Sequence, residues 1–309
     1  PSGVPSYDTF ARVFRLLDAQ QLARACLQWL QQLAGQVQGT VAIDGTSVSG
    51  SRKGNGTKAL HLVSAWAADM GLLLGQRKVD GKSNEIRAIP ELLSMLHLKG
   101  CIVTIDAIGC QKSIARQLQE RGADYVLSLK GNQKHMHAVV QKHFEGSSTT
   151  EPGCSLYSER FSGHGRKELR SYRVSPIAQA LARAAAHWPA LSCIVPVQRH
   201  PQQAGKAASE EISYYLSSLP AHTPAHVLAH SIRAHWQVEN ALHWSLDVSF
   251  SEDASRVRKD NAAHNLALMR RLALGQLKAD KTLKVGIQSK RRRAGWDLDY
   301  LGKVMGWKI

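Results

Sequence analysis

Cysteines are few in this 309-residue sequence, and long apolar runs are missing. The five cysteines are scattered and form no C-x-x-C pair, which argues against a disulfide framework or a zinc knuckle and favours reduced, buried thiols of an intracellular protein. No run approaches the roughly 18 apolar residues that span a bilayer, and no charged-then-apolar leader opens the sequence. We therefore expect a cytoplasmic protein without a membrane partner. Because the sequence starts at Pro1 rather than at methionine, we expect a fragment or a processed product.

Acidic residues are scarce relative to basic ones. Forty Lys and Arg against 24 Asp and Glu give a formal net charge of +16, which predicts attraction to a polyanion, first of all nucleic acid. A protein that is merely soluble and basic is the alternative. The excess is uneven, since residues 256–309 hold 14 Lys and Arg but 4 Asp and Glu. We expect phosphate contacts to concentrate there, above all at the cluster Lys290, Arg291, Arg292 and Arg293.

The N-terminal part of the chain changes from helical to strand-like patterns. Apolar residues at helical spacing over residues 6–33 predict two short helices broken near Asp18. A further helix is expected from Ser83, its cap, to about His97, with Pro90 as a point of kinking. Between these helices, short apolar runs separated by turn-rich gaps predict an antiparallel meander of three strands: Thr40–Asp44, Ala59–Ala67 and Leu72–Val79.

A strand, a helix and a strand come next, at residues 101–106 (CIVTID), about 111–121 and 125–129 (YVLSL). Both strands are nearly continuous apolar runs, as in parallel strands covered on both faces, so we expect a right-handed crossover. Three antiparallel strands followed by parallel strands and helices is the order of an RNase H-like sheet. The predicted fold class is therefore α/β, with an RNase H-like mixed sheet, flanking helices and helical termini.

The pattern becomes irregular between residues 131 and 208, which we interpret as a β-rich insertion. A strand at 211–217 and helices at about 224–244 and 261–277 follow it. These boundaries predict a helical N-terminal segment at 1–36, a catalytic domain at 37–285 with the insertion inside it, and a basic tail at 286–309. The N-terminal segment reads as the end of a truncated domain.

Two predicted strands end in an aspartate, Asp44 in TVAID and Asp106 in CIVTID. If the strands are neighbours in the sheet, the carboxylates lie side by side and repel each other unless a cation bridges them. Oxygen ligands of this kind favour Mg²⁺, and a pair of ions can activate a water or hydroxyl and stabilise the leaving oxygen of a phosphodiester. The alternative is that each aspartate is a turn former.

Glu239 lies in the stretch HWQVENALHW, where His235, Glu239 and His243 share one helical face. This face can be a zinc site, a solvated surface, or the position of a third metal-binding carboxylate, which is the interpretation we prefer. Asp247, Glu252 and Asp253 compete for that third role. Asp247 is about two turns away, and Glu252 and Asp253 are expected to cap the next helix or to pair with Arg256 and Arg258.

Lys130 and Asn132 follow the strand at 125–129 in the stretch SLKGNQ. We expect them to flank the rim of the site and to contact phosphate or the metal shell. A polar turn after a strand explains them equally well.

Three segments together resemble the DDE transposases of the ISAs-type insertion sequences, also called H-repeat-associated proteins: VAIDGTSVSGS, VTIDAIGCQKSIARQLQERGADYVLSLKGNQ and IRAHWQVENALHWSLDVSFSEDASRVRKDNAAHNLALMRRLAL. Asp44, Asp106 and Glu239 stand where that family has its two aspartates and its glutamate. The resemblance implies an RNase H-like core, two Mg²⁺ ions that Mn²⁺ can replace, and cleavage and strand transfer at element ends. It further implies double-stranded DNA partners, namely terminal inverted repeats and target DNA, and a homodimer on paired ends, associated with the nucleoid.

The sequence departs from the family in two places. Related transposases often carry Tyr, Arg, Glu and Lys at fixed spacing; Arg233 precedes Glu239 by six residues, but no lysine follows in the next two turns. We therefore expect a DNA contact from Arg233 and assign none to a lysine here. The family also begins with a longer helical segment. The alternative function is accordingly an inactive, N-terminally truncated transposase remnant that only binds DNA.

Overall fold

The computed structural model describes residues 3, 5–34, 37–51, 59–79, 84–145, 152–163, 166–203 and 210–306. Contacts divide the chain into two compact units that alternate along the sequence. The first unit comprises Pro1–Gln38, Ala42–Leu96 and Trp236–Ile309, and the second comprises Gly39–Val41 and His97–His235. The predicted N-terminal segment and C-terminal tail thus both belong to the first unit. No helix in the described ranges is long and apolar enough to cross a membrane.

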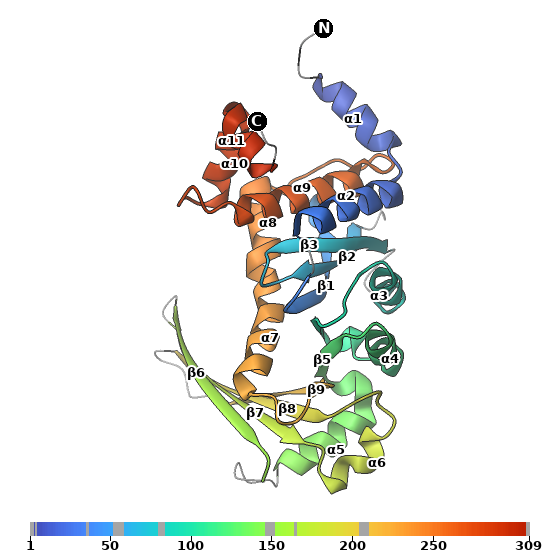
Figure 1. Cartoon of the computed structure of the whole chain (residues 1–309), viewed down its shortest axis with the longest axis vertical. Helices are drawn as coiled ribbons and strands as arrows, with labels where there is room; N and C mark the ends of the chain where they lie inside the picture. The colour runs from blue at the N-terminus through green and yellow to red at the C-terminus, as the bar shows by residue number, and fades with distance from the viewer. Residues whose placement is uncertain are drawn as a thin grey trace. The chain divides into compact units, whose positions relative to one another are not determined.

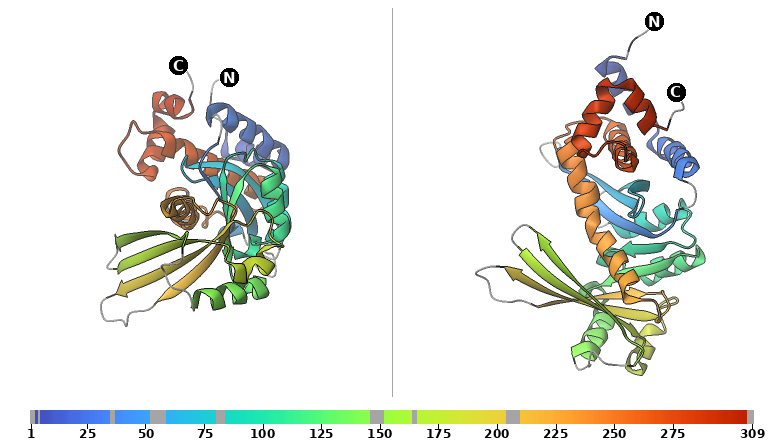
Figure 2. Two further views of the ribbon diagram at one scale, coloured as in Figure 1. Left: turned by 60° about the horizontal axis from the view of Figure 1, so that its bottom comes forward. Right: turned by 60° about the vertical axis from the view of Figure 1, so that its left-hand side comes forward.

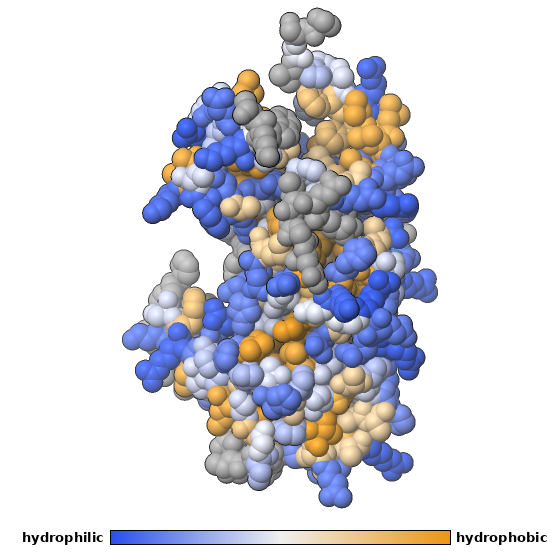
Figure 3. Space-filling model, in the orientation of Figure 1, coloured by the Kyte–Doolittle hydropathy of each residue, from blue (hydrophilic) through white to orange (hydrophobic). Residues whose placement is uncertain are grey.

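The first unit opens with two helices, as predicted. Helices α1 (Tyr7–Leu16) and α2 (Ala19–Ala34) are separated at Asp18, whose Oδ1 accepts the N–H groups of Gln20 and Gln21 and so caps α2. Helix α1 has no buried residue, and it exposes Tyr7, Phe10, Val13, Leu16 and Leu17. Figure 3 shows apolar surface gathered over this part of the chain, at the upper right.

Strands of the first unit follow in the order β3, β2, β1, with β1 at Thr40–Val48, β2 at Leu60–Ala67 and β3 at Leu72–Val79. Strands β2 and β3 pair antiparallel, from His61 opposite Val79 to Ala67 opposite Leu72. Helix α3 (Glu85–Ser94) contacts β2 and β3, and it contains Pro90. Its N-cap is Asn84; the predicted cap, Ser83, lies outside the described residues.

The helices that follow Phe250 complete the first unit (Figure 1). Helix α9 (Ala262–Ala279) contacts β3, α1 and α2, and its apolar side chains share a core with Ala42, Trp66 and Leu73 of the strands. The segment predicted as a basic tail is folded instead: helices α10 (Ile287–Trp296) and α11 (Leu298–Val304) pack together, with Tyr300 and Val304 buried. Apolar residues at helical spacing among the basic ones explain why this segment folds.

The second unit contains a mixed sheet in the order β4, β5, β9, β8, β7, β6. Strands β4 (Ile102–Ile105) and β5 (Asp124–Leu129) are parallel and joined by α4 (Lys112–Glu120), which confirms the predicted crossover. All other pairs are antiparallel, between β6 (Ser155–Gly163), β7 (Arg166–Pro176), β8 (Cys193–Gln203), β9 (Glu211–Ser217) and β5. The predicted insertion therefore extends this sheet through β9 rather than forming a separate layer.

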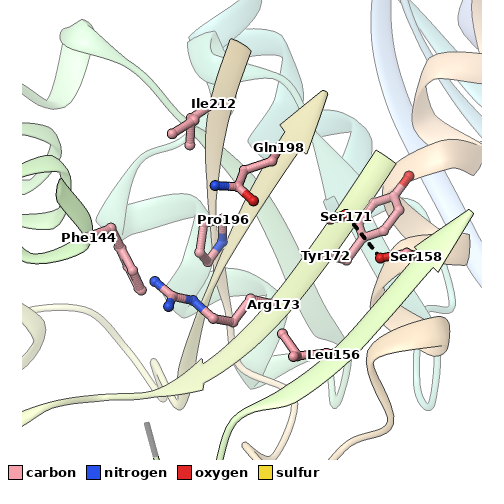
Figure 4. Close-up of a pocket in the computed structure, with 9 residues that line it drawn as sticks. All are labelled: Phe144, Leu156, Ser158, Ser171, Tyr172, Arg173, Pro196, Gln198 and Ile212. Carbon is pink, nitrogen blue, oxygen red and sulfur yellow. Dashed lines mark hydrogen bonds between the residues drawn. The ribbon is translucent and has the colours of Figure 1, made fainter. Parts of the chain in front are cut away.

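One face of the inserted strands is covered in part by α5 (Lys134–Glu145), a helix that the sequence pattern did not reveal (Figure 2). The ring of Phe144 stacks on Tyr214, and the Arg173 guanidinium lies 4.5 Å above Phe144. Beside them is a cavity of about 250 Å³, where Ser158 and Ser171 share a hydrogen bond (Figure 4). The short helix α6 (Ala182–Ala185) completes the described helices of the insertion.

All five cysteines are free. Cys101, Cys110 and Cys193 are buried, and burial raises the pKa of the Cys193 thiol to about 12. Cys26 and Cys154 are partly exposed, so the predicted burial of the thiols is confirmed for three of the five.

Candidate active site

Asp44 is the fifth of the nine residues of β1, where the strand passes from fully buried to partly buried residues, so the prediction that it ends the strand is wrong. Alternation along the strand places its side chain on the same face as Ala42, which packs in a core with Val238, Leu242 and Leu246. Its carboxylate Oδ2 lies 3.8 Å from Nδ1 of His243, and the Asp44 side chain is 24% exposed. The first predicted carboxylate therefore faces the helix that carries Glu239.

That helix is irregular at the predicted third carboxylate. Helix α7 (Ala225–Val238) passes into a π-helix at Glu239–Trp244, which continues directly into α8 (Ser245–Phe250). The sequence predicted one regular helix over this range. A π-helix adds a residue to the turn and rotates the following side chains, so His235, Glu239 and His243 do not keep the regular spacing of one face. Such turns are frequent at functional sites.

His243 is the best-defined side chain of this π-helix. Burial is the main reason that the pKa of its imidazole falls to about 4, and Arg271 lowers it further. Its Nε2 is buried and has no hydrogen-bond partner among the described residues. The imidazole beside Asp44 is therefore neutral near neutral pH, and it contributes no positive charge to the carboxylate.

Behind β1, a buried chain of hydrogen bonds supports the segment that follows Asp44. Ser47 Oγ lies 2.8 Å from His61 Nδ1, and His61 Nε2 lies 2.6 Å from Glu85 Oε1. The His61 and Glu85 side chains are 6% and 5% exposed. A Cβ on Gly45 would lie 2.4 Å from Glu85 Oε1, so only glycine fits next to Asp44.

Sequence reasoning missed this chain of hydrogen bonds. The sequence pattern assigned no role to Glu85. The available signal was His61, a polar residue inside an otherwise apolar, fully buried strand, because a buried polar group requires a partner.

Asp106, in the second unit, is held by its own backbone. It caps the short turn Ala107–Gly109, with Oδ1 accepting the N–H of Ile108 at 3.1 Å. Nearby, Thr104 Oγ1 lies 3.2 Å from Nδ1 of His235. Burial lowers the pKa of His235, while Asp106 acts in the opposite direction. Asp106 thus emerges from the strand end in a fixed direction, as the sequence pattern suggested.

The predicted rim residues lie beside this turn. Asn132 Nδ2 donates to the carbonyl of Ala107, the residue after Asp106, and Gln133 Nε2 donates to Cys110 O at 2.8 Å. Lys130 is exposed, and its charge contributes to the lowered pKa of His235. The structure therefore gathers Lys130 and Asn132 with Asp106 in one unit.

Some of the predicted DNA-binding side chains are exposed, and some are bound to other groups of the protein. Arg233 forms an ion pair with Glu159 and is 42% exposed. Lys290 is buried: its Nζ donates to the carbonyls of Leu277 and Asp280, so it closes the end of α9 and faces away from solvent. The other three cations of the cluster, Arg291, Arg292 and Arg293, are exposed, and Arg293 pairs with Asp297 at 3.0 Å.

The acids that compete with Glu239 have other roles. Glu252 is buried and pairs with Arg271 at 2.7 Å, while Asp253 Oδ1 accepts the N–H of Ser49. Their predicted pairing with Arg256 and Arg258 is wrong: Arg258 donates to the carbonyl of Gly50. Asp247 is exposed on α8. Glu252 is unavailable to a metal because its charge is already neutralised in the interior.

Within the described residues, no group of three or more His, Cys, Asp or Glu side chains is arranged to hold a metal ion. Asp44 and the Glu239 helix belong to the first unit and Asp106 to the second, and the side chain of Glu239 lies outside the description. What the structure brings together is Asp44 with His243 on one side, and Asp106 with Lys130, Asn132 and His235 on the other. The zinc interpretation of His235 and His243 has no set of ligands here.

Comparison with known proteins identifies the class. Residues 35–275 match the family model described as Transposase DDE domain, a range that includes Asp44, Asp106 and Glu239. The chain belongs to the DDE transposase family. It is an enzyme of the type that uses divalent metal ions.

Its relatives point to insertion elements. The chain is 38% identical to YncI of Escherichia coli O157:H7, which is named as a transposase, over 98% of this chain and 78% of that protein. It is 36% identical to YhhI of Escherichia coli strain K12, named as an H repeat-associated transposase, over 98% of this chain and 81% of that protein. A piggyBac transposase in a synaptic complex with hairpin DNA has a distant likeness, with a TM-score of 0.48 and 13% identity over 97% of this chain and 61% of that chain.

Proposed function

We propose that the protein cleaves DNA strands at the ends of an insertion element and joins them to target DNA, using Asp44, Asp106 and Glu239 as metal-binding carboxylates in an RNase H-like core. The observation that carries the proposal is the approach of Asp44 Oδ2 to His243, because it brings the first strand-borne carboxylate to the helix of Glu239. The strand-end position of Asp106 and the family match over all three residues support the rest.

The surroundings of the acids fit a hard divalent cation. Each is an oxygen ligand, and the neutral imidazole of His243 leaves the negative charge of Asp44 uncompensated by that neighbour. Two Mg²⁺ ions would supply a nucleophile of lowered pKa and a counter-charge for the leaving 3′ oxygen. Asp44 and Asp106 are short ligands carried by β1 and by the turn after β4, and we expect the longer glutamate to approach the metal from its helix.

DNA is the proposed partner, held as a duplex by basic side chains. Arg291, Arg292 and Arg293 are exposed on α10, and Lys130 and Asn132 lie beside the turn of Asp106. Paired element ends require two active centres, so we propose a homodimer on terminal inverted repeats. Sedimentation of the protein with and without end-containing duplex tests this point: a monomer in both states contradicts it.

Plasmid nicking tests the catalytic proposal. Asp44→Asn, Asp106→Asn and Glu239→Gln are each expected to reduce Mg²⁺-dependent nicking to background while DNA binding is retained, since each removes only a charge that faces phosphates. Mn²⁺ is expected to support cleavage, Ca²⁺ to support binding without cleavage, and EDTA to abolish cleavage.

Asp247→Asn and Asp253→Asn are the matched controls, because both acids are exposed and lie a few residues downstream. Both variants are expected to keep measurable nicking. Loss of nicking in Asp253→Asn with activity in Glu239→Gln would show that the third ligand is misplaced. A wild-type chain that binds DNA with a steep salt dependence but never nicks it would instead be an inactive remnant.

A further inference from the structure

The first unit contains a cavity of about 320 Å³ beside β3, the terminal strand in the sheet order, away from the residues assigned above. Three of its walls are the end of β3, the start of α2 and the start of α9. The residues that matter for its chemistry are Ala23, Gln76, Arg77, Lys78, Asn261 and His264.

Two buried side chains that line this cavity have unmet hydrogen-bonding atoms. Gln76 is 1% exposed; its Nε2 donates to His264 O at 3.4 Å, but its Oε1 has no partner among the described residues. His264 is 9% exposed, and its Nε2 likewise has no partner there. Buried polar groups normally find partners, so these two atoms indicate that something else occupies the cavity.

The start of α9 adds further donors. Ala262 N–H bonds to Lys259 O, which leaves the N–H groups of Ala263 and His264, in the same first turn, without an acceptor in the helix. Asn261 is the N-cap residue, and its side chain makes no capping bond. The N-terminus of an 18-residue helix favours a bound anion.

The charges around the cavity favour an anion as well. Its two acids are already engaged, Asp18 in capping α2 and Glu91 in an ion pair with Arg77 at 3.0 Å. Lys78 is exposed and has no acidic partner in the described chain. The pKa of His264 falls to about 4, mainly through burial and then through the positive charge of Lys78, Arg271 and Arg77.

We propose that this cavity binds a nucleotide, with the phosphate at the N-terminus of α9 beside Lys78 and a donor of the base or sugar on Gln76 Oε1. A fully ionised phosphate only accepts hydrogen bonds, so it cannot satisfy Gln76 Oε1 by itself. The apolar wall formed by Ala19, Ala23 and Met95 suits the carbon face of a base. The nucleotide is either a free mononucleotide or an unpaired nucleotide of a DNA strand; only the second source rests on the proposed function.

Calorimetric titration of the full chain tests the proposal with three probes: inorganic phosphate, deoxyadenosine monophosphate and a short single-stranded oligonucleotide. The mononucleotide is expected to bind one to one, at least tenfold more tightly than phosphate. Equal affinity for phosphate and mononucleotide, or no binding of the mononucleotide, overturns the proposal. No nicking is measured, so the result does not depend on catalysis.

Variants locate the binding. Lys78→Met and the isosteric Gln76→Met are each expected to weaken mononucleotide binding at least tenfold, whereas Arg87→Met, which removes an exposed cation outside the cavity, leaves it unchanged. Unchanged binding in both variants would place the nucleotide elsewhere and overturns the assignment.

The oligonucleotide distinguishes the two sources. If its affinity falls in Lys78→Met and Gln76→Met in parallel with that of the mononucleotide, the site takes a nucleotide of a strand. If only mononucleotide binding falls, the site takes a free nucleotide.

Discussion

The two compact units hold their charged side chains in different ways. In the first unit, Glu252 with Arg271 is an ion pair and His61 with Glu85 is a hydrogen-bonded pair, both almost fully removed from solvent. In the second unit, Arg199 with Glu211 is a pair whose side chains are 31% and 59% exposed, and the strands are held by long, regular antiparallel registers. The interior pairs make the first unit sensitive to the loss of one partner, and the second unit should tolerate such losses.

The largest effect is expected from Arg271→Met. This change leaves the Glu252 carboxylate buried without its partner, which costs about 3–5 kcal/mol. The exposed pair gives the comparison, since Arg199→Met should cost less than about 1 kcal/mol. Urea unfolding measures both. The double variant with Arg271→Met and Glu252→Met should recover most of the lost free energy of unfolding. If Arg271→Met and Arg199→Met cost the same free energy, the proposed difference between the two units is wrong.

A lower pH should reduce the free energy of unfolding of the first unit, because His264 is buried in it. Burial lowers the pKa of His264 to about 4, so between about pH 6.5 and 4 the unfolded chain takes up a proton that the folded protein does not. Stability therefore falls as the pH falls through this window, by up to about 3 kcal/mol. His264→Gln should flatten the fall, measured by unfolding at a series of pH values, while exposed His135→Gln should not. If the free energy of unfolding depends on pH in the same way in His264→Gln and His135→Gln, the prediction is wrong.

The Gly45→Ala variant tests a closely packed position of the first unit, and Gly131→Ala tests an open position of the second. The new Cβ would overlap the Glu85 carboxylate, which cannot move without breaking its bond to His61, and overpacking of this kind costs about 1–3 kcal/mol. Gly131→Ala, where nothing lies within 4 Å, is the control and should be neutral. Thermal melting decides between them; a neutral Gly45→Ala would mean that Glu85 is free to shift.

The smallest effects concern the basic cluster on α10. Lys290→Met should cost about 1–2 kcal/mol, from lost hydrogen bonds to two carbonyls and a lost ion pair with Asp280 at 3.7 Å, and leave the salt dependence of DNA binding unchanged. Arg292→Ala should do the reverse, lowering the slope of log affinity against log salt by about 0.9 without affecting stability. Titration of a duplex at several salt concentrations separates the two. A reduced slope in Lys290→Met would show that this lysine reaches phosphate after all.

Much of the fold was predictable because the relevant signals are local. The break at Asp18, the crossover from β4 through α4 to β5, and the β-rich character of the insertion follow from apolar spacing and turn residues. Helix α5 was missed because its apolar residues are interspersed with histidine and lysine. The C-terminal helices were missed because the basic cluster masked a small apolar face that packs on α8 and α9.

The sequence was enough to assign the family, the aspartate that follows β4 and the helix of Glu239, since strand endings and helical spacing are properties of short segments. The end of β1 was misplaced, because this strand continues past Asp44 to Val48. Only the tertiary structure decided which polar residues are buried together. His243 faces Asp44 from 199 positions away, Glu85 lies behind Gly45, and Lys290 turns inward to α9 although its three neighbours face solvent. Such pairings depend on packing between distant elements, where a single turn of π-helix or one buried carbonyl redirects a side chain, and no local pattern records them.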